Sequence, residues 1–109
     1  GDWILKMSIV AALSEMAEPR AIEVLRDALT NDNDLIVTMA VGAIGELGAI
    51  EAIEDLTPFT QHPDTQVRFR VAQALGHLGG DRAKELLTAM LNDADAQVVE
   101  QVQLAIASL

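Results

Sequence analysis

The sequence predicts an all-α protein, a right-handed α-solenoid of 31-residue helical hairpins with about seven helices. Three observations lead to this fold class. Half of the residues are hydrophobic but only 3% are aromatic, so the core must be aliphatic, which favours helices over an aromatic-rich β-sandwich. The chain repeats with a gapless period of 31 residues. Within each repeat the apolar residues have the spacing of a helix.

The repeat defines the domain organisation. Corresponding apolar segments begin at Leu5, Ile36, Val67 and Val98, each 31 residues after the last. An isolated helical hairpin cannot cover its apolar stripes, so successive hairpins are expected to stack and share one core. The 109 residues are therefore predicted to form a single repeat domain, 1–109. Its units are expected at about residues 2–32, 33–63, 64–94 and, as a half-repeat, 95–109.

The first helix of each unit carries one apolar stripe. In the third unit this stripe is Val67, Val71, Leu75 and Leu78, at i, i+4, i+8 and i+11. An Asn or Asp precedes three of the stripes, where its side chain can cap the free amides of a helix start, at Asn33, Asp64 and Asp95. The first helices are predicted over about residues 3–16, 34–47, 64–78 and 95–108.

Glycines occupy two repeated positions near the ends of these helices. The later position predicts a left-handed helix end, at Gly48 and Gly79. The earlier position, three residues before, predicts a place where the next helix packs closely, at Gly45 and Gly76.

A shorter second helix follows in each complete unit, predicted over residues 19–30, 50–60 and 81–92. Pro19 suits a first helical turn. Pro58 falls late in its helix, so a kink or an early end is expected there.

One segment carries a family resemblance. Residues 67–83 read VRFRVAQALGHLGGDRA, and this string resembles the short HEAT-like repeat of the phycobilisome-lyase type. The resemblance implies an α-solenoid and covers essentially the whole chain. It also implies several functions, because this unit occurs in adaptors, bilin lyase subunits and an iron-dependent hydroxylase. The His-Glu pairs of the hydroxylase are absent here, since Pro63 follows His62 and Leu78 follows His77.

Charge and cysteine content exclude several classes of function. Seventeen acidic against seven basic residues give a net charge of −10, which argues against binding nucleic acid or an anionic membrane surface. The absence of cysteine excludes disulfides, thiol nucleophiles and cysteine-ligated metals, and agrees with a reducing, cytoplasmic location. No apolar run approaches the ~20 residues of a membrane span.

The sequence offers no catalytic or metal-ligating group that we expect to function. Glu15, Glu46 and His77 share one repeat position, which places one potential ligand on each of three hairpins. Stacked helices lie about 8–10 Å apart, whereas ligands lie about 2 Å from a shared metal. We therefore expect no metal site, no cofactor and no catalytic centre in this chain. The basic segment at Arg68 is expected to pair with an acid within the chain.

The candidate binding residues lie on the second helices. Glu23, Glu54 and Glu85 share one position and predict an acidic row along this face. Arg20, Glu51 and Arg82 flank the row at another shared position. We expect the second helices to line the concave side and to form a groove for a basic or mixed-charge protein. The alternative is that these residues are the ordinary solvated faces of amphipathic helices.

The last predicted helix has no second helix after it, so Val102, Ile106 and Leu109 are expected to be uncovered. This pattern predicts either a piece of a longer repeat protein or end-to-end self-association. The function expected from the sequence is a protein–protein interaction module. The alternative is a fragment or subunit of a bilin lyase, with a phycobiliprotein as its partner.

Overall fold

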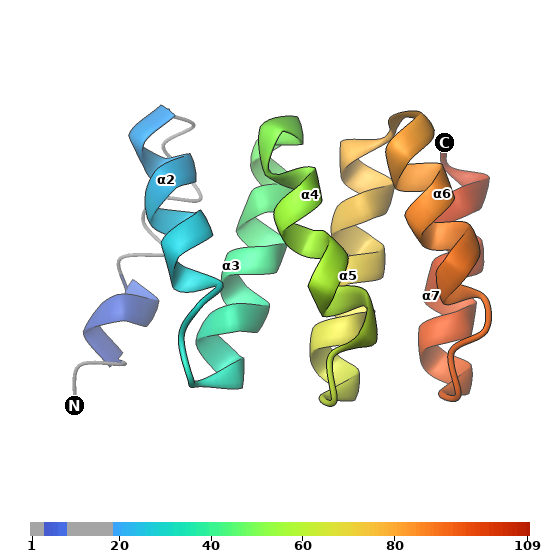
Figure 1. Cartoon of the computed structure of the whole chain (residues 1–109), viewed down its shortest axis with the longest axis horizontal. Coiled ribbons are helices and arrows are strands. Elements are labelled where there is room, and N and C mark those ends of the chain that lie inside the picture. The colour runs from blue at the N-terminus through green and yellow to red at the C-terminus, as the bar shows by residue number, and fades with distance from the viewer. Residues whose placement is uncertain (1–3, 9–18) are drawn as a thin grey trace.

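The structure is a computed structural model that describes residues 4–8 and residues 19–109 of the chain. The predicted helix 3–16 therefore falls largely outside the described residues, of which 4–8 are helical. The remaining elements are all helices, and they stack side by side along the molecule (Figure 1). In chain order they are α2 (Pro19–Ala28), α3 (Asp34–Leu47), η1 (Ile50–Ala52), α4 (Ile53–Leu56), η2 (Thr57–Gln61), α5 (Thr65–Leu78), α6 (Gly80–Met90) and α7 (Ala96–Ala107).

The helices form two layers. In Figure 1, α2, α4 and α6 lie in front of α3, α5 and α7, which gives a second-helix layer and a first-helix layer. Neighbours in the first-helix layer make the most extensive contacts in the described molecule, between α3 and α5 and between α5 and α7. This arrangement confirms the predicted all-α solenoid. None of the described helices is long and apolar enough to cross a membrane.

The starts of the first helices are fixed by side-chain caps. Asn33 Oδ1 accepts from the Leu35 amide at 2.9 Å, and Asp64 Oδ1 accepts from the Gln66 amide at 2.7 Å. Asp95 repeats the contact with Gln97 at 2.8 Å. Each bond satisfies an amide that the first turn of a helix leaves without a partner. All three predicted caps are therefore confirmed.

The second helix of the middle unit is broken. Residues 50–60 were expected to form one helix, but they divide into η1, α4 and η2. Pro58 has no amide hydrogen to bond the carbonyl of Glu54, so the α-helix ends at Leu56 and the chain continues as a tighter 3₁₀ helix. The early end predicted at Pro58 is confirmed, and the prediction of one continuous helix is wrong.

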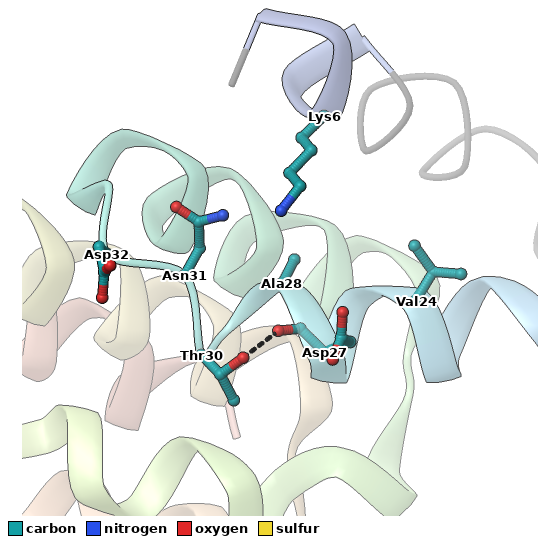
Figure 2. Close-up of a pocket in the computed structure, with 7 residues that line it drawn as sticks. All are labelled: Lys6, Val24, Asp27, Ala28, Thr30, Asn31 and Asp32. Atoms are coloured by element: carbon teal, nitrogen blue, oxygen red, sulfur yellow. Dashed lines mark hydrogen bonds between the residues drawn. The ribbon is translucent and has the colours of Figure 1, made fainter. Parts of the chain in front are cut away.

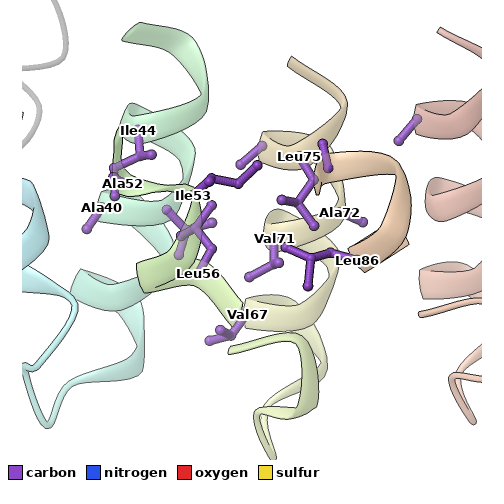
Figure 3. Close-up of a cluster of buried hydrophobic side chains, with 14 of the residues drawn as sticks. Ala40, Ile44, Ala52, Ile53, Leu56, Val67, Val71, Ala72, Leu75 and Leu86 are labelled. Atoms are coloured by element: carbon purple, nitrogen blue, oxygen red, sulfur yellow. The ribbon is translucent and has the colours of Figure 1, made fainter. Parts of the chain in front are cut away.

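The core lies between the two layers and is aliphatic. Figure 3 shows Val67, Val71 and Leu75 of α5 between side chains from α3, α4 and α6. The same repeat positions are filled by Ile36 and Ile44 in α3, and all five side chains are fully buried. Burying each such side chain contributes about 1.5–3 kcal/mol, so the repeated stripe is the main source of stability.

Glycine allows the first helices to approach closely. A Cβ added at Gly45 would lie 2.7 Å from the Cα of Ala74, and one added at Gly76 would lie 2.9 Å from the Cβ of Ala105. The predicted close packing is thus confirmed at both glycines. Gly48 has the expected left-handed backbone, with φ 67° and ψ 33°, whereas Gly79 combines φ 69° with an extended ψ of −173°. The second predicted cap is therefore a different turn.

Replacing Gly45 with alanine is expected to destabilise the protein. The new Cβ would collide with the backbone of Ala74, and overpacking of this kind costs about 1–3 kcal/mol. Gly42 of the same helix provides a matched control, because its nearest neighbour at 3.3 Å is the flexible side chain of Arg70. Gly42→Ala should be neutral or stabilising by up to about 1 kcal/mol. Urea denaturation of both variants measures the difference, and equal midpoints would contradict the close-packing role.

Candidate functional site

The candidate binding residues lie on the exposed side of the second-helix layer. Glu23 is on α2, Glu54 on α4 and Glu85 on α6, and all three are exposed. Glu51 in η1 and Arg82 in α6 are exposed as well. Arg20 lies in the first turn of α2, and its side chain is outside the described part of the structure.

Arg82 binds two members of the acidic row. Its Nε lies 2.8 Å from Glu54 Oε2 and a terminal nitrogen lies 3.1 Å from Glu54 Oε1, a bidentate ion pair between α6 and α4. Another nitrogen donates to Glu85 Oε2 at 3.1 Å. The hydrogen bond from Arg82 lowers the pKa of Glu54 below its usual 4.5. The same contact raises the pKa of Arg82. The row is thus partly neutralised between α4 and α6.

The junction between α2 and α4 has different chemistry at the same repeat positions. Glu23 corresponds to Glu54, and Glu51 stands where Arg82 stands one repeat later. No cation among the described side chains forms an ion pair with either glutamate. The two helices are joined instead by Arg26 and Asp55, whose Nε and Oδ2 lie 2.6 Å apart. Among the described side chains, this junction therefore lacks the bridge that Arg82 makes between α4 and α6.

A second repeated set lies in the loops that lead into the first helices. Asn31, His62 and Asp93 share one repeat position, and each accepts a hydrogen bond from the amide two residues later, at 2.8, 3.0 and 2.9 Å. Sequence reasoning missed this set. Its signal was an Asn, His or Asp two residues before every capping residue.

Arg68 binds Asp93 in the loop that leads into α7. Its guanidinium makes a two-point pair with Asp93, at 2.8 and 3.3 Å, and also donates to the carbonyl of His62 at 2.7 Å. The side chains of Arg68 and Asp93 are only 16% and 6% exposed. This confirms the predicted pairing of Arg68 within the chain. Arg70, by contrast, is exposed and donates to Gln73 at 3.1 Å.

Two hollows lie on the loop side of the second helices. The first, of about 460 Å³, lies between the helix at residues 4–8 and the end of α2, with Lys6 extending toward Ala28 and Asn31 (Figure 2). The second, of about 390 Å³, surrounds the pair of Arg68 and Asp93. Polar side chains contribute much of both linings, including Asp27 in the first.

No three side chains capable of holding a metal come together within residues 4–8 and 19–109. Of the repeated set considered for this role, Glu15 lies outside the described residues, while Glu46 and His77 are exposed on α3 and α5.

The uncovered apolar residues of the last helix differ from those expected. Val102 is fully buried, contrary to the prediction that it would be uncovered, because the stacking of α7 on α5 and α6 already covers it. Ile106 is half-buried and Leu109 is 46% exposed. Leu104 of α7 is 59% exposed, so Leu104 and Leu109 provide the exposed apolar surface at this end.

Substitutions of Asp93 should separate its two contacts. Asp93→Asn keeps an oxygen for the amide of Asp95 but removes the charge that pairs with Arg68, and breaking a buried pair in this way costs about 3 kcal/mol. Asp93→Ala also removes the turn bond and should cost about 1 kcal/mol more. Urea denaturation measures both values. Equal stability of wild type and Asp93→Asn would show that the ion pair contributes nothing.

The bridge of Arg82 to Glu54 should make a contribution to stability that depends on pH. Because the pKa of Glu54 is lowered in the folded protein, this contribution is present above the usual glutamate pKa of 4.5 and is lost as the pH falls through the folded value. Glu54→Gln should therefore be less stable than wild type at pH 7 and equally stable near pH 3. Glu51→Gln, which removes an acid with no described cation beside it, is the matched control. Thermal unfolding at both pH values tests this, and a loss in Glu54→Gln that persists at pH 3 would contradict it.

Comparison with known families agrees with the fold. The family model of HEAT repeats matches residues 38–107, and the model of the PBS lyase HEAT-like repeat matches residues 5–31. A comparison with curated proteins gives no match. The first match alone covers more than half of the chain, and the described helices stack in two layers. The chain therefore belongs to the HEAT repeat family, with repeats of the PBS lyase HEAT-like type.

Proposed function

We propose that this chain is a protein-interaction module that binds a basic or mixed-charge surface of a partner protein on the exposed face of α2, α4 and α6. HEAT repeats generally mediate protein–protein interaction, which supports a protein partner. The observation that carries the choice of face is the row of exposed glutamates, Glu23, Glu54 and Glu85, one on each second helix.

The junction of α2 and α4 is the strongest part of this face. Between α4 and α6, one guanidinium binds the acid of the preceding repeat through two hydrogen bonds. Between α2 and α4 the corresponding position holds Glu51, so two acids, Glu23 and Glu51, occupy positions that hold an ion pair in the next repeat. A lysine or arginine from a partner supplies the charge that Arg82 supplies within the chain. We therefore propose Glu23 and Glu51 as the main contacts, with Glu54, Glu85, Arg20 and Arg82 around them.

Electrostatic contacts of this type determine specificity and association rate more than affinity. Exposed charges are screened over about 8 Å at physiological ionic strength, so binding through this face weakens as salt is added. A partner held mainly by apolar contacts would not show this dependence.

Charge reversal at the α2–α4 junction should weaken partner binding. Glu23→Lys combined with Glu51→Lys places two cations against a basic partner surface, and about tenfold weaker binding is expected from two exposed charges worth roughly 0.5–1 kcal/mol each. Glu46→Lys combined with Glu100→Lys makes the same change in net charge on the exposed side of the first-helix layer and is the matched control. The partner is captured with wild-type protein from a cell extract of the source organism, purified, and titrated against all three proteins at two salt concentrations.

Unchanged folding of the variants is checked by circular dichroism and thermal unfolding. Equal loss of binding in both double variants would indicate a general charge effect. Loss in the control alone would place the binding face on the first-helix layer and reject the proposal.

A second candidate function is the handling of bilins as part of a lyase, with a phycobiliprotein as partner. It is favoured by the match of residues 5–31 to the PBS lyase HEAT-like repeat. Mixing the protein with a bilin and a phycobiliprotein tests it directly, since a shift in bilin absorbance or covalent transfer is the expected signal. The same titration without the phycobiliprotein separates bilin binding from transfer.

A further inference from the structure

The three loop residues Asn31, His62 and Asp93 accept the same backbone hydrogen bond in successive repeats, but with different acceptor atoms. Each accepts the amide proton of the capping residue two positions later and so positions the start of α3, α5 or α7. Asn31 and Asp93 use an oxygen, which remains an acceptor throughout the neutral pH range. His62 uses the ring nitrogen Nδ1, which accepts only while it carries no proton.

The geometry around His62 determines which nitrogen carries the proton. Nδ1 lies 3.0 Å from the donating amide of Asp64, so the neutral ring must be protonated on Nε2. Nε2 faces Asp34 Oδ1 at 3.5 Å, at the start of α3. The ring is stacked on Phe59, with centroids 5.9 Å apart, and the side chain is 20% exposed.

The charged groups around the ring act in opposite directions. Asp34 attracts a protonated ring, and the face of Phe59 does so through a cation–π contact. The guanidinium of Arg68 lies against the His62 carbonyl and opposes a second positive charge, although its pair with Asp93 reduces this effect. The carboxylate of Asp64 is directed at the amide of Gln66. A protonated ring is therefore retained between Phe59 and Asp34 while its bond to the Asp64 amide is lost.

We propose that protonation of His62 controls the turn between the second and third hairpins. With a neutral ring, His62 fastens the loop to the start of α5 through the Asp64 amide. With a protonated ring, that bond is exchanged for an ion pair with Asp34 at the start of α3. Imidazole is the side chain whose unperturbed titration lies between pH 5 and pH 8, so an exchange controlled by its proton is tested between those values. The turns at Asn31 and Asp93 do not respond over this range.

Nuclear magnetic resonance of the ¹⁵N-labelled full chain tests the proposal. At pH 7.5 the His62 ring should be the Nε2–H tautomer and show a scalar coupling across the hydrogen bond from Nδ1 to the Asp64 amide nitrogen. At pH 5 this coupling should vanish. The exchange of the Asp64 amide with solvent should then rise about fivefold relative to the amides of Asn33 and Asp95, as expected for one lost hydrogen bond. Those two amides are controls within the same molecule.

His62→Asn places the residue of the first repeat in the second and keeps an acceptor at every pH. In this variant the relative exchange of the Asp64 amide should be the same at pH 7.5 and pH 5. His77, which is exposed on α5, gives a second imidazole signal for comparison in the same spectra. An Nδ1–H tautomer at pH 7.5 would overturn the proposal. So would an Asp64 amide that keeps its coupling and its relative exchange rate after the His62 ring has titrated.

Discussion

The close contact between successive first helices is the constraint on which the rest of the structure depends. Gly45 faces the backbone of Ala74, and Gly76 faces Ala105, at separations that leave no room for a Cβ. Larger residues at these positions would hold the helices apart and open gaps beside the buried stripe, whose members include Ile44 and Leu75. Because the helices are so close, the core between them has little room for aromatic rings, which accounts for the aliphatic composition of the chain.

The second helices are under a weaker constraint. Their neighbours meet through the ends of long side chains, as in the pairs of Arg26 with Asp55 and of Arg82 with Glu54. This layer therefore tolerates a helix that Pro58 divides into three short pieces.

Periodicity predicts whatever is repeated and local, and it fails where a single repeat departs from the others. The bounds of α3 and all three side-chain caps could be predicted because they depend on residues within a few positions of one another. The two-point bridge from Arg82 to Glu54 spans 28 residues and depends on helix spacing and side-chain conformation. The turn bonds of the loops could not be predicted for another reason, since a histidine in a loop can equally be a metal ligand or an acceptor for a backbone amide.

Two positions of the second hairpin depart from both of its neighbours. Glu51 stands where the first and third hairpins have arginine, and His62 stands where they have Asn31 and Asp93. Val37 stands where the third hairpin has Arg68, but the last unit also has a valine there, Val99. Repeats within one chain share the same folding requirement, so a position that differs between them is not dictated by the fold alone. Val37 is explained by packing, because its side chain is buried. Arg68, at the same position one repeat later, is accommodated by its pair with the carboxylate of Asp93. Glu51 and His62 have no such explanation, and both change the charge or its response to pH at a junction between hairpins. The proposed binding contacts and the proposed response to pH therefore both involve a residue of the second hairpin.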